Sequence, residues 1–168
     1  ITLCRGYAAK NIPQECALVV IGNAVSRDNP EVLQVAARSL PYTCFPEALA
    51  SLVIGERHSV VVTGTHGKST TTTLLASLLM ECNRDPSFFI GGLPKGFASG
   101  LRVGGGSVSV VEGDEYDSAF FAKVPKFRFY RPTTAIITSI EYDHAGIYPS
   151  LDAIIKEFDG LVDLLPPQ

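Results

Sequence analysis

Short apolar runs alternate with longer segments of helical periodicity along most of the chain. The apolar runs are rich in β-branched residues, which is typical of strands buried in a sheet. The predicted strands are 17–21, 40–44, 59–63, 87–92, 108–112 and 134–140, and the predicted helices are 30–39, 46–54, 68–82 and 150–165. This alternation predicts an α/β fold with a parallel sheet.

Local signals support the helix boundaries and one domain boundary. Asn29 is a good N-cap, Pro30 suits the first helical position, and Glu31 suits the positive end of the helix. The polar stretch at 55–58 separates two groups of elements. We therefore expect residues 1–55 to end one domain and residues 56–168 to form most of a second.

Composition narrows the class of protein. The chain has 168 residues, a length that suits one ordinary domain or parts of two, and 46% of them are hydrophobic. The net charge of −3 argues against a broad basic surface for nucleic acid. No apolar run is long enough for a membrane span. The chain shows no signal peptide and does not begin with Met, so we expect a piece of a longer protein.

Cysteine spacing gives no sign of a zinc site or a disulfide framework. Cys4, Cys16, Cys44 and Cys82 are widely separated, and no C-x-x-C pair occurs. Reduced thiols in a cytoplasmic protein are the simplest interpretation.

The segment "VVVTGTHGKSTTTTLLASLL", residues 60–79, combines a buried strand, a glycine-containing turn, and a Lys-Ser pair that opens a helix. This arrangement binds phosphate, because glycines let backbone N–H groups approach an anion and the helix N-terminus carries partial positive charge. Lys68 can reach the β and γ phosphates, and Ser69 can offer its hydroxyl to Mg²⁺. We expect the nucleotide to contact Gly64, Thr65, His66, Gly67, Lys68, Ser69 and Thr70.

Four consecutive threonines, Thr70 to Thr73, are a poor start for a helix, because β-branched residues have low helix propensity. Phosphate binding at the helix N-terminus can offset that propensity. Packing of 71–73 against the sheet would explain them equally well. Val62 stands where the strict G-x-x-x-x-G-K-[ST] pattern has its first glycine, and the absence of N-K-x-D argues against a GTPase.

Acidic residues follow two further predicted strands. "SVSVVEGDEYD" ends in Glu112 and the acids at 114–117, and "TTAIITSIEYDH" ends in Glu141, Asp143 and His144. Ligands of open parallel sheets bind beyond the carboxyl ends of the strands. We therefore predict that Ser69, Glu112 and His144 serve Mg²⁺ beside a nucleotide held by Lys68, although acidic clusters are often only solvated turns.

These motifs together resemble the Mur ligase family, ATP-dependent enzymes that form amide bonds in peptidoglycan. "TGTHGKSTTTTLLASLL" is similar to the family's ATP loop, and "VVEGDEYDSAFF" and "IEYDHAGIYPSL" are similar to its next two signatures. "LVVIGNAVSRDNPEV" and "LPYTCFPEAL" resemble the end of the family's uridine-nucleotide domain. The resemblance implies a P-loop ATPase domain preceded by the end of a Rossmann-like UDP-binding domain, with the C-terminal domain absent.

The resemblance also implies residue roles. Lys68, Glu112 and His144 would be catalytic, with ATP and Mg²⁺ as cofactors. The implied reaction joins UDP-N-acetylmuramate to a murein tripeptide through an acyl phosphate, and Tyr116 within "DEYD" favours this over addition of L-alanine. Residues expected near the UDP-sugar or the peptide are Asn23, Gly91, Gly92, Asp114, Glu115 and Asp117. Addition of L-alanine, folylpolyglutamate synthesis, and a nucleotide-binding module without catalysis stay open as alternatives.

Overall fold

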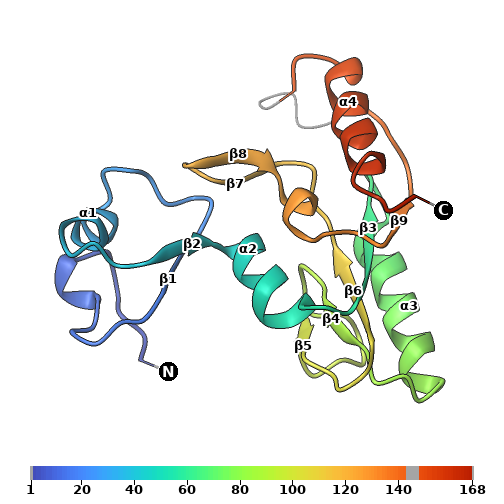
Figure 1. Ribbon diagram of the computed structural model, residues 1–168, viewed down its shortest axis with the longest axis horizontal. Helices are drawn as coiled ribbons and strands as arrows, with labels where there is room; N and C mark the ends of the chain where they lie inside the picture. Colours follow the sequence, from blue (N-terminus) through green and yellow to red (C-terminus); the bar gives the residue numbers. More distant parts are fainter. Residues whose placement is uncertain (1, 143–147, 168) are drawn as a thin grey trace.

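A five-stranded sheet organises most of the protein (Figure 1), whose computed structural model describes residues 2–142 and 148–167. The sheet order is β5 (Leu101–Arg102), β4 (Ser87–Phe89), β6 (Val108–Glu112), β3 (His58–Thr63) and β9 (Thr134–Ile137). Every pairing in this sheet is parallel except the one between β4 and β5. The structure confirms the predicted α/β class with a mostly parallel sheet.

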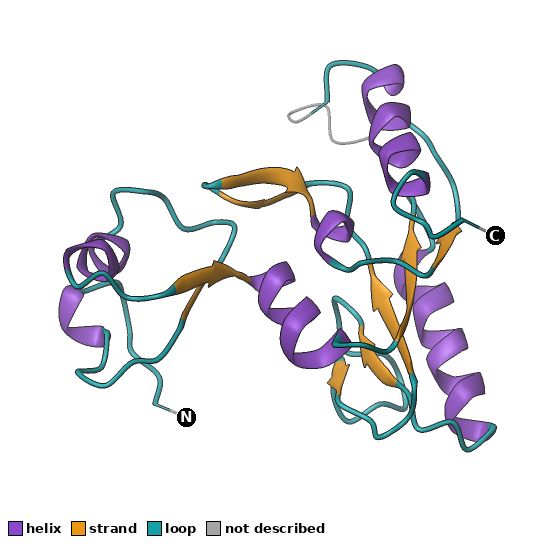
Figure 2. Ribbon diagram, in the orientation of Figure 1, coloured by secondary structure: helices purple, strands orange, loops and turns teal. Residues whose placement is uncertain are grey.

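Helices cover both faces of this sheet (Figure 2). Alternate residues of β3 point to opposite faces, so Val60 and Val62 pack on one side and Val61 on the other. Helix α3 (Lys68–Glu81) packs against the first face through Ala76 and neighbouring apolar residues. The second face is covered by the segments that contribute Leu49, Ala50, Val53, Ile54, Phe127, Tyr130, Tyr148, Ile154, Phe158 and Leu161.

The N-terminal part of the chain forms a separate, two-stranded parallel pair. Strands β1 (Val19–Ile21) and β2 (Tyr42–Cys44) are joined by helix α1 (Pro30–Ala37), and a short 3₁₀ turn, η1 (Ala9–Asn11), precedes them. The Asn29 side chain accepts a hydrogen bond from the Glu31 N–H at 2.9 Å, as the capping prediction requires. Helix α2 (Phe45–Leu49) continues into a π-helical turn, η2 (Ala50–Ile54), that leads to β3.

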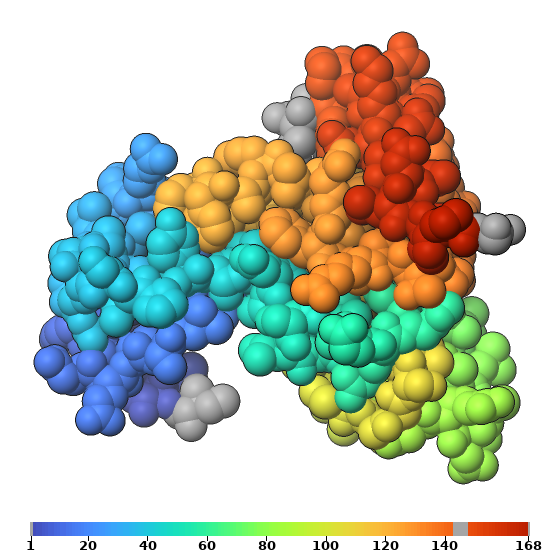
Figure 3. Space-filling view, in the orientation of Figure 1, coloured from blue at the N-terminus to red at the C-terminus, as the bar shows by residue number. Residues whose placement is uncertain are grey.

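An antiparallel hairpin that the sequence did not predict follows β6 and packs against this pair. Its strands are β7 (Asp117–Ala119) and β8 (Ala122–Pro125), and a 3₁₀ turn, η3 (Lys126–Phe129), follows. The Phe121 ring at the hairpin tip lies 5.2 Å from the Tyr42 ring of β2, in an edge-on arrangement. Figure 3 shows the hairpin surface against the N-terminal segment.

Several predicted boundaries are wrong by a few residues. The strand predicted at 134–140 ends at Ile137, because the chain then bends across the loop after β3 and bonds to it. The strand predicted at 87–92 ends at Phe89, and the glycine-rich segment after it contains β5. Helix α4 (Leu151–Val162) ends three residues before the predicted position. Its start is as predicted, because Ser150 is the N-cap and its hydroxyl accepts from the Ala153 N–H at 3.3 Å.

Two further observations concern the whole of the described chain. All four cysteines are free thiols, and Cys44 is fully buried. No helix within 2–142 or 148–167 has the length and apolar character needed to cross a bilayer.

Candidate nucleotide site

The loop between β3 and α3 has a backbone that only glycine adopts easily at two positions. Gly64 has φ +126° and Gly67 has φ +81°. A Cβ on Gly64 would lie 2.7 Å from the Ser139 carbonyl oxygen, so a side chain there is excluded by space as well as by φ. Gly67 is the N-cap of α3 and offers no side-chain cap, which leaves the N–H groups of the first turn for a ligand.

Lys68 opens α3 and points back over this loop. Its Nζ donates to the Gly64 carbonyl oxygen at 2.7 Å and lies 3.1 Å from Glu115 Oε2. The Glu115 side chain is 2% exposed and that of Lys68 is 13% exposed. The Tyr148 hydroxyl donates to the Glu115 backbone carbonyl, and burial raises the pKa of Tyr148 to about 12, which keeps this donor neutral.

Glu112, at the carboxyl end of β6, joins α3 to the loop after β4. Its Oε1 accepts from Ser69 Oγ at 2.7 Å, and its Oε2 accepts from the Gly91 N–H at 2.8 Å. The residue is 7% exposed. A carboxylate beside a hydroxyl is an oxygen donor pair of the kind Mg²⁺ prefers. The structure therefore confirms the prediction that Glu112 lies next to the Lys-Ser pair at one edge of the sheet.

The two donors fit a magnesium ion that also binds phosphate. Within the described parts of the chain, no three His, Cys, Asp or Glu side chains gather into a metal-binding group. Mg²⁺ commonly takes one or two carboxylates from the protein and completes its octahedron with water and substrate phosphates. The pair of Ser69 and Glu112, next to a helix N-terminus, matches that requirement.

Residues that follow β9 hold the β3–α3 loop in place. The Ser139 carbonyl accepts from the Thr65 N–H at 2.9 Å, and Ser139 Oγ accepts from the His66 N–H at 3.1 Å. Thr65 Oγ1 accepts from the Glu141 N–H at 2.9 Å. The backbone N–H groups of Thr65 and His66 are thus already used within the protein. The His66 ring is exposed, with Nε2 3.8 Å from a Glu141 oxygen.

The threonine run bonds mainly to its own helix. Thr72 Oγ1 donates to the Lys68 carbonyl at 2.8 Å, and Thr73 Oγ1 donates to the Ser69 carbonyl at 2.6 Å. Thr72 is fully buried, so packing explains it without a ligand. These bonds to carbonyls one turn earlier satisfy the hydroxyls, and Thr73 also faces the cleft described next.

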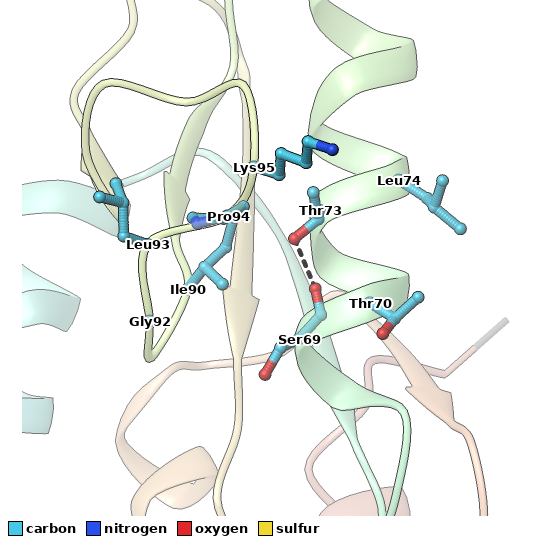
Figure 4. A pocket seen from close by; sticks show the side chains of 9 residues that line it. All are labelled: Ser69, Thr70, Thr73, Leu74, Ile90, Gly92, Leu93, Pro94 and Lys95. Atoms are coloured by element: carbon cyan, nitrogen blue, oxygen red, sulfur yellow. Dashed lines mark hydrogen bonds between the residues drawn. The ribbon is translucent and has the colours of Figure 1, made fainter.

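A cleft of about 370 Å³ runs beside the first two turns of α3 (Figure 4). Figure 4 shows α3 on one side and the loop after β4 on the other, with the Ser69 hydroxyl at the end nearest the β3–α3 loop. The cleft is lined by Ser69, Thr70, Thr73, Leu74, Ile90, Gly92, Leu93, Pro94 and Lys95. Thr70 and Gly92, both predicted site residues, therefore face a space continuous with Ser69.

Other predicted site residues lie elsewhere. Asp114 Oδ2 is 2.7 Å from the Lys126 Nζ, and Asp117 Oδ2 is 2.7 Å from the Lys123 Nζ. Asn23 lines a different cavity, beside β1. His144 was predicted to bind the metal and to be catalytic. It is outside the described residues, and so is Asp143.

Sequence reasoning did not anticipate two features of this site. The contact of the Glu115 carboxylate with Lys68 was not predicted, and the expectation that Glu115 lies near the sugar or peptide stays a prediction. Ser139 was not singled out, although its place two residues beyond β9 puts it at the same sheet edge as the loop. The sequence did contain a signal for Ser139, because it follows the carboxyl end of β9, the strand next to β3.

Comparison with known proteins places the chain in a family. The model of the Mur ligase middle domain matches residues 62–168. The chain belongs to the Mur ligase family.

Relatives within the family carry two different names. The chain is 42% identical over its whole length to the Escherichia coli UDP-N-acetylmuramate–L-alanyl-γ-D-glutamyl-meso-2,6-diaminoheptandioate ligase. It is 39% identical, over 97% of its length, to the UDP-N-acetylmuramate–L-alanine ligase of Paenarthrobacter aurescens. The crystal structure of the Neisseria meningitides UDP-N-acetylmuramate:L-alanyl-γ-D-glutamyl-meso-diaminopimelate ligase matches 98% of the chain with a TM-score of 0.90 and 35% identity.

The match covers only part of each relative. The chain spans 37% of the E. coli protein, 34% of the P. aurescens protein, and 54% of the N. meningitides chain in the crystal structure. The Mur ligase assignment therefore applies to the family, and the reaction of a complete protein is a separate question.

Proposed function

We propose that this chain is the nucleotide-binding part of an ATP-dependent ligase that joins UDP-N-acetylmuramate to the tripeptide L-Ala-γ-D-Glu-meso-diaminopimelate. The observation that carries the proposal is the contact of Ser69 and Gly91 with Glu112, beside Lys68 at the start of α3. Family membership and the names of the E. coli and N. meningitides relatives support the choice of reaction. Such a protein, working on nucleotide substrates, would act in the cytoplasm.

We assign roles to the loop and its neighbours on this basis. The β3–α3 loop would act as the P-loop, with Lys68 and the first-turn N–H groups of α3 holding the phosphates of ATP. Ser69 and Glu112 would hold Mg²⁺, which when bound would neutralise phosphate charge. Because the N–H groups of Thr65 and His66 already bond to Ser139, the phosphate contacts should come from Gly67 onward.

The residues of the chain would lower the electrostatic barrier to phosphoryl transfer. The lactyl carboxylate of UDP-N-acetylmuramate must approach the γ-phosphate of ATP, and the two anions repel each other. Lys68 and the helix N-terminus would reduce that repulsion and stabilise the charge that develops during phosphoryl transfer. Transfer of the γ-phosphoryl group to the carboxylate gives an acyl phosphate and releases ADP. The amino group of the tripeptide then attacks the acyl carbon, which forms the amide and releases phosphate. Fixed orientation of the acceptor supplies much of the remaining rate.

The proposed domain organisation follows the same family pattern. Residues 1–55 would end a Rossmann-like UDP-sugar domain, and residues 56–168 would form most of the central ATP-binding domain. The parallel pair β1–β2, crossed over by α1, supports the first assignment, because parallel strands are normally part of a larger covered sheet. Remaining parts of the site would come from the rest of a longer ligase, and the 168 residues alone would bind without catalysing the reaction.

Addition of L-alanine is the second candidate reaction. The 39% identity to the P. aurescens ligase over 97% of the chain favours it almost as strongly. Both reactions use the same nucleotide and the same sugar, so the ATP site itself does not separate them.

The test is a comparison of amine acceptors with the full-length ligase that contains this chain. ADP release would be measured with UDP-N-acetylmuramate and ATP in the presence of either the tripeptide or L-alanine. We expect the tripeptide to give a kcat/KM at least tenfold higher than L-alanine. A preference for L-alanine would replace the proposed reaction with the second candidate. Absence of ADP release with both acceptors, in a protein that binds Mg-ATP, would support a binding module instead.

A further inference from the structure

A second cavity, of about 310 Å³, lies between the N-terminal strands and the β7–β8 hairpin. Asn23 lines it just beyond the end of β1, and Phe45 lines it just beyond the end of β2. Ser118 of β7 and Lys126, directly after β8, complete the wall from the hairpin side. The cavity thus sits where parallel strands end, which is the usual place for a ligand in α/β proteins.

The wall of this cavity carries an ammonium. Lys126 is the one charged side chain among the described residues that line the cavity, and its ion-pair partner Asp114 is not one of the lining residues. Ser118 donates its hydroxyl to the Val124 carbonyl at 3.0 Å, so it is already bonded within the hairpin. The exposed Asn23 amide adds a neutral hydrogen-bond donor. An anionic oxygen is the ligand group that suits an ammonium beside an amide.

Two neighbours fix the position of the Lys126 ammonium. Its Nζ is 2.7 Å from Asp114 Oδ2 and 4.3 Å from the centre of the Tyr116 ring. The Lys126 backbone N–H also donates to the Asp114 carbonyl, at 3.0 Å. Burial, followed by the charge and hydrogen bond of Asp114, raises the pKa of Tyr116, so its hydroxyl stays protonated and bonded to that carboxylate. An ammonium has three N–H donors, so donors remain after Asp114 takes one.

We propose that Lys126 binds an anionic oxygen of UDP-N-acetylmuramate, with Asp114 and Tyr116 as the residues that position it. This inference rests on the proposed function, because that function supplies the substrate. The diphosphate and the lactyl carboxylate of the substrate share the required chemistry. Either would place the sugar nucleotide between β1–β2 and the hairpin.

Calorimetry on the full-length ligase tests this with two nucleotides. UDP-N-acetylmuramate carries both anionic groups, whereas UDP-N-acetylglucosamine has the diphosphate but no lactyl carboxylate. Lys126→Met should weaken binding of UDP-N-acetylmuramate by about tenfold to a hundredfold, the range for a lost charged hydrogen bond. Equal weakening of both nucleotides would identify the diphosphate as the bound group. Weakening of UDP-N-acetylmuramate alone would identify the carboxylate.

Lys123→Met is the matched control. Lys123 lies on the same hairpin and pairs with Asp117 at 2.7 Å, but it is exposed and does not line the cavity. Its replacement should leave both affinities unchanged. Lys126→Arg should restore part of the affinity, and the KM for ATP should stay constant in all these variants.

A double variant separates binding from folding. Lys126→Met alone leaves the half-buried Asp114 carboxylate without this ion pair, whereas Asp114→Asn combined with Lys126→Met removes both charges. The double variant should melt as a folded protein and still bind UDP-N-acetylmuramate at least tenfold more weakly. Wild-type affinity in either Lys126 variant would overturn the inference while leaving the proposed function intact. A wild-type ligase that binds neither nucleotide would overturn both.

Discussion

The Glu115 carboxylate lies 3.1 Å from the Lys68 ammonium and is almost completely buried. Lys68 is the residue that we propose holds the phosphates of ATP. A phosphate entering the loop would therefore compete with Glu115 for the same ammonium. On the proposed function, Glu115 would act on the nucleotide through Lys68, which makes it a positioning residue.

Removal of Lys68 should cost stability as well as binding. Lys68→Met leaves the buried Glu115 carboxylate without the ammonium, and the loss of one partner of a buried pair is strongly destabilising. We expect a decrease of about 1 to 3 kcal/mol in the free energy of unfolding, because Lys68 keeps some exposure. Urea denaturation of Lys68→Met, Glu115→Gln and the double variant would measure the coupling. Additive effects of the two substitutions would show that the pair contributes nothing to stability.

Glu112→Gln should separate metal-dependent from metal-independent binding. Glutamine keeps the size of the side chain and can still accept from Ser69 or Gly91, so the fold should survive. Its neutral amide is a poorer ligand for Mg²⁺. We expect Mg-ATP to bind about tenfold more weakly or worse, while ATP in the presence of a chelator binds as to the wild type. Calorimetry in the two buffers would measure both affinities, and an unchanged Mg²⁺ dependence would remove Glu112 from the metal site.

The turn that joins α3 to β4 should respond to acid through Asp85. Its carboxylate accepts from the Gly105 N–H at 2.6 Å and from the Arg102 guanidinium. The Gly105 bond, and then Arg102, lower the pKa of Asp85 below its ordinary value of 3.8. A depressed folded-state pKa gives stability that is present above the unfolded pKa and is lost as the pH falls through the folded pKa.

Asp85→Asn should therefore be less stable than the wild type at pH 7, and the gap should close below about pH 4. Urea denaturation of both proteins at a series of pH values would measure this difference in the free energy of unfolding. A gap that stays constant down to pH 2 would mean that the ionised carboxylate is not what stabilises this turn.

The sequence predicts much of the central sheet because its signals there are local. The β-branched runs at 59–63 and 108–112 match β3 and β6 within one residue, since strands covered on both faces are continuously apolar. The Gly67-Lys68-Ser69 sequence places the start of α3 correctly. The meeting of Ser69 and Glu112 follows from one topological rule about the carboxyl ends of parallel strands.

Features that depend on contacts between distant segments were not predictable in the same way. The β7–β8 hairpin has a short loop of Phe120 and Phe121, and its position depends on the Tyr42 ring some eighty residues away. The early end of β9 reflects bonds from Ser139 to the β3–α3 loop. Lys68 pairs with Glu115 and not with another acid of the same cluster because of side-chain packing, which the spacing of residues along the sequence does not reveal.

The central claim is that Ser69, Glu112 and Lys68 surround one magnesium nucleotide. A crystal structure of the full-length ligase with Mg²⁺ and a non-hydrolysable ATP analogue tests it most directly. We predict a metal at about 2.0–2.1 Å from the Ser69 hydroxyl and one Glu112 oxygen, with the Lys68 ammonium on the phosphates. A nucleotide bound away from the start of α3, with Glu112 still hydrogen-bonded to Ser69 and Gly91, would contradict it.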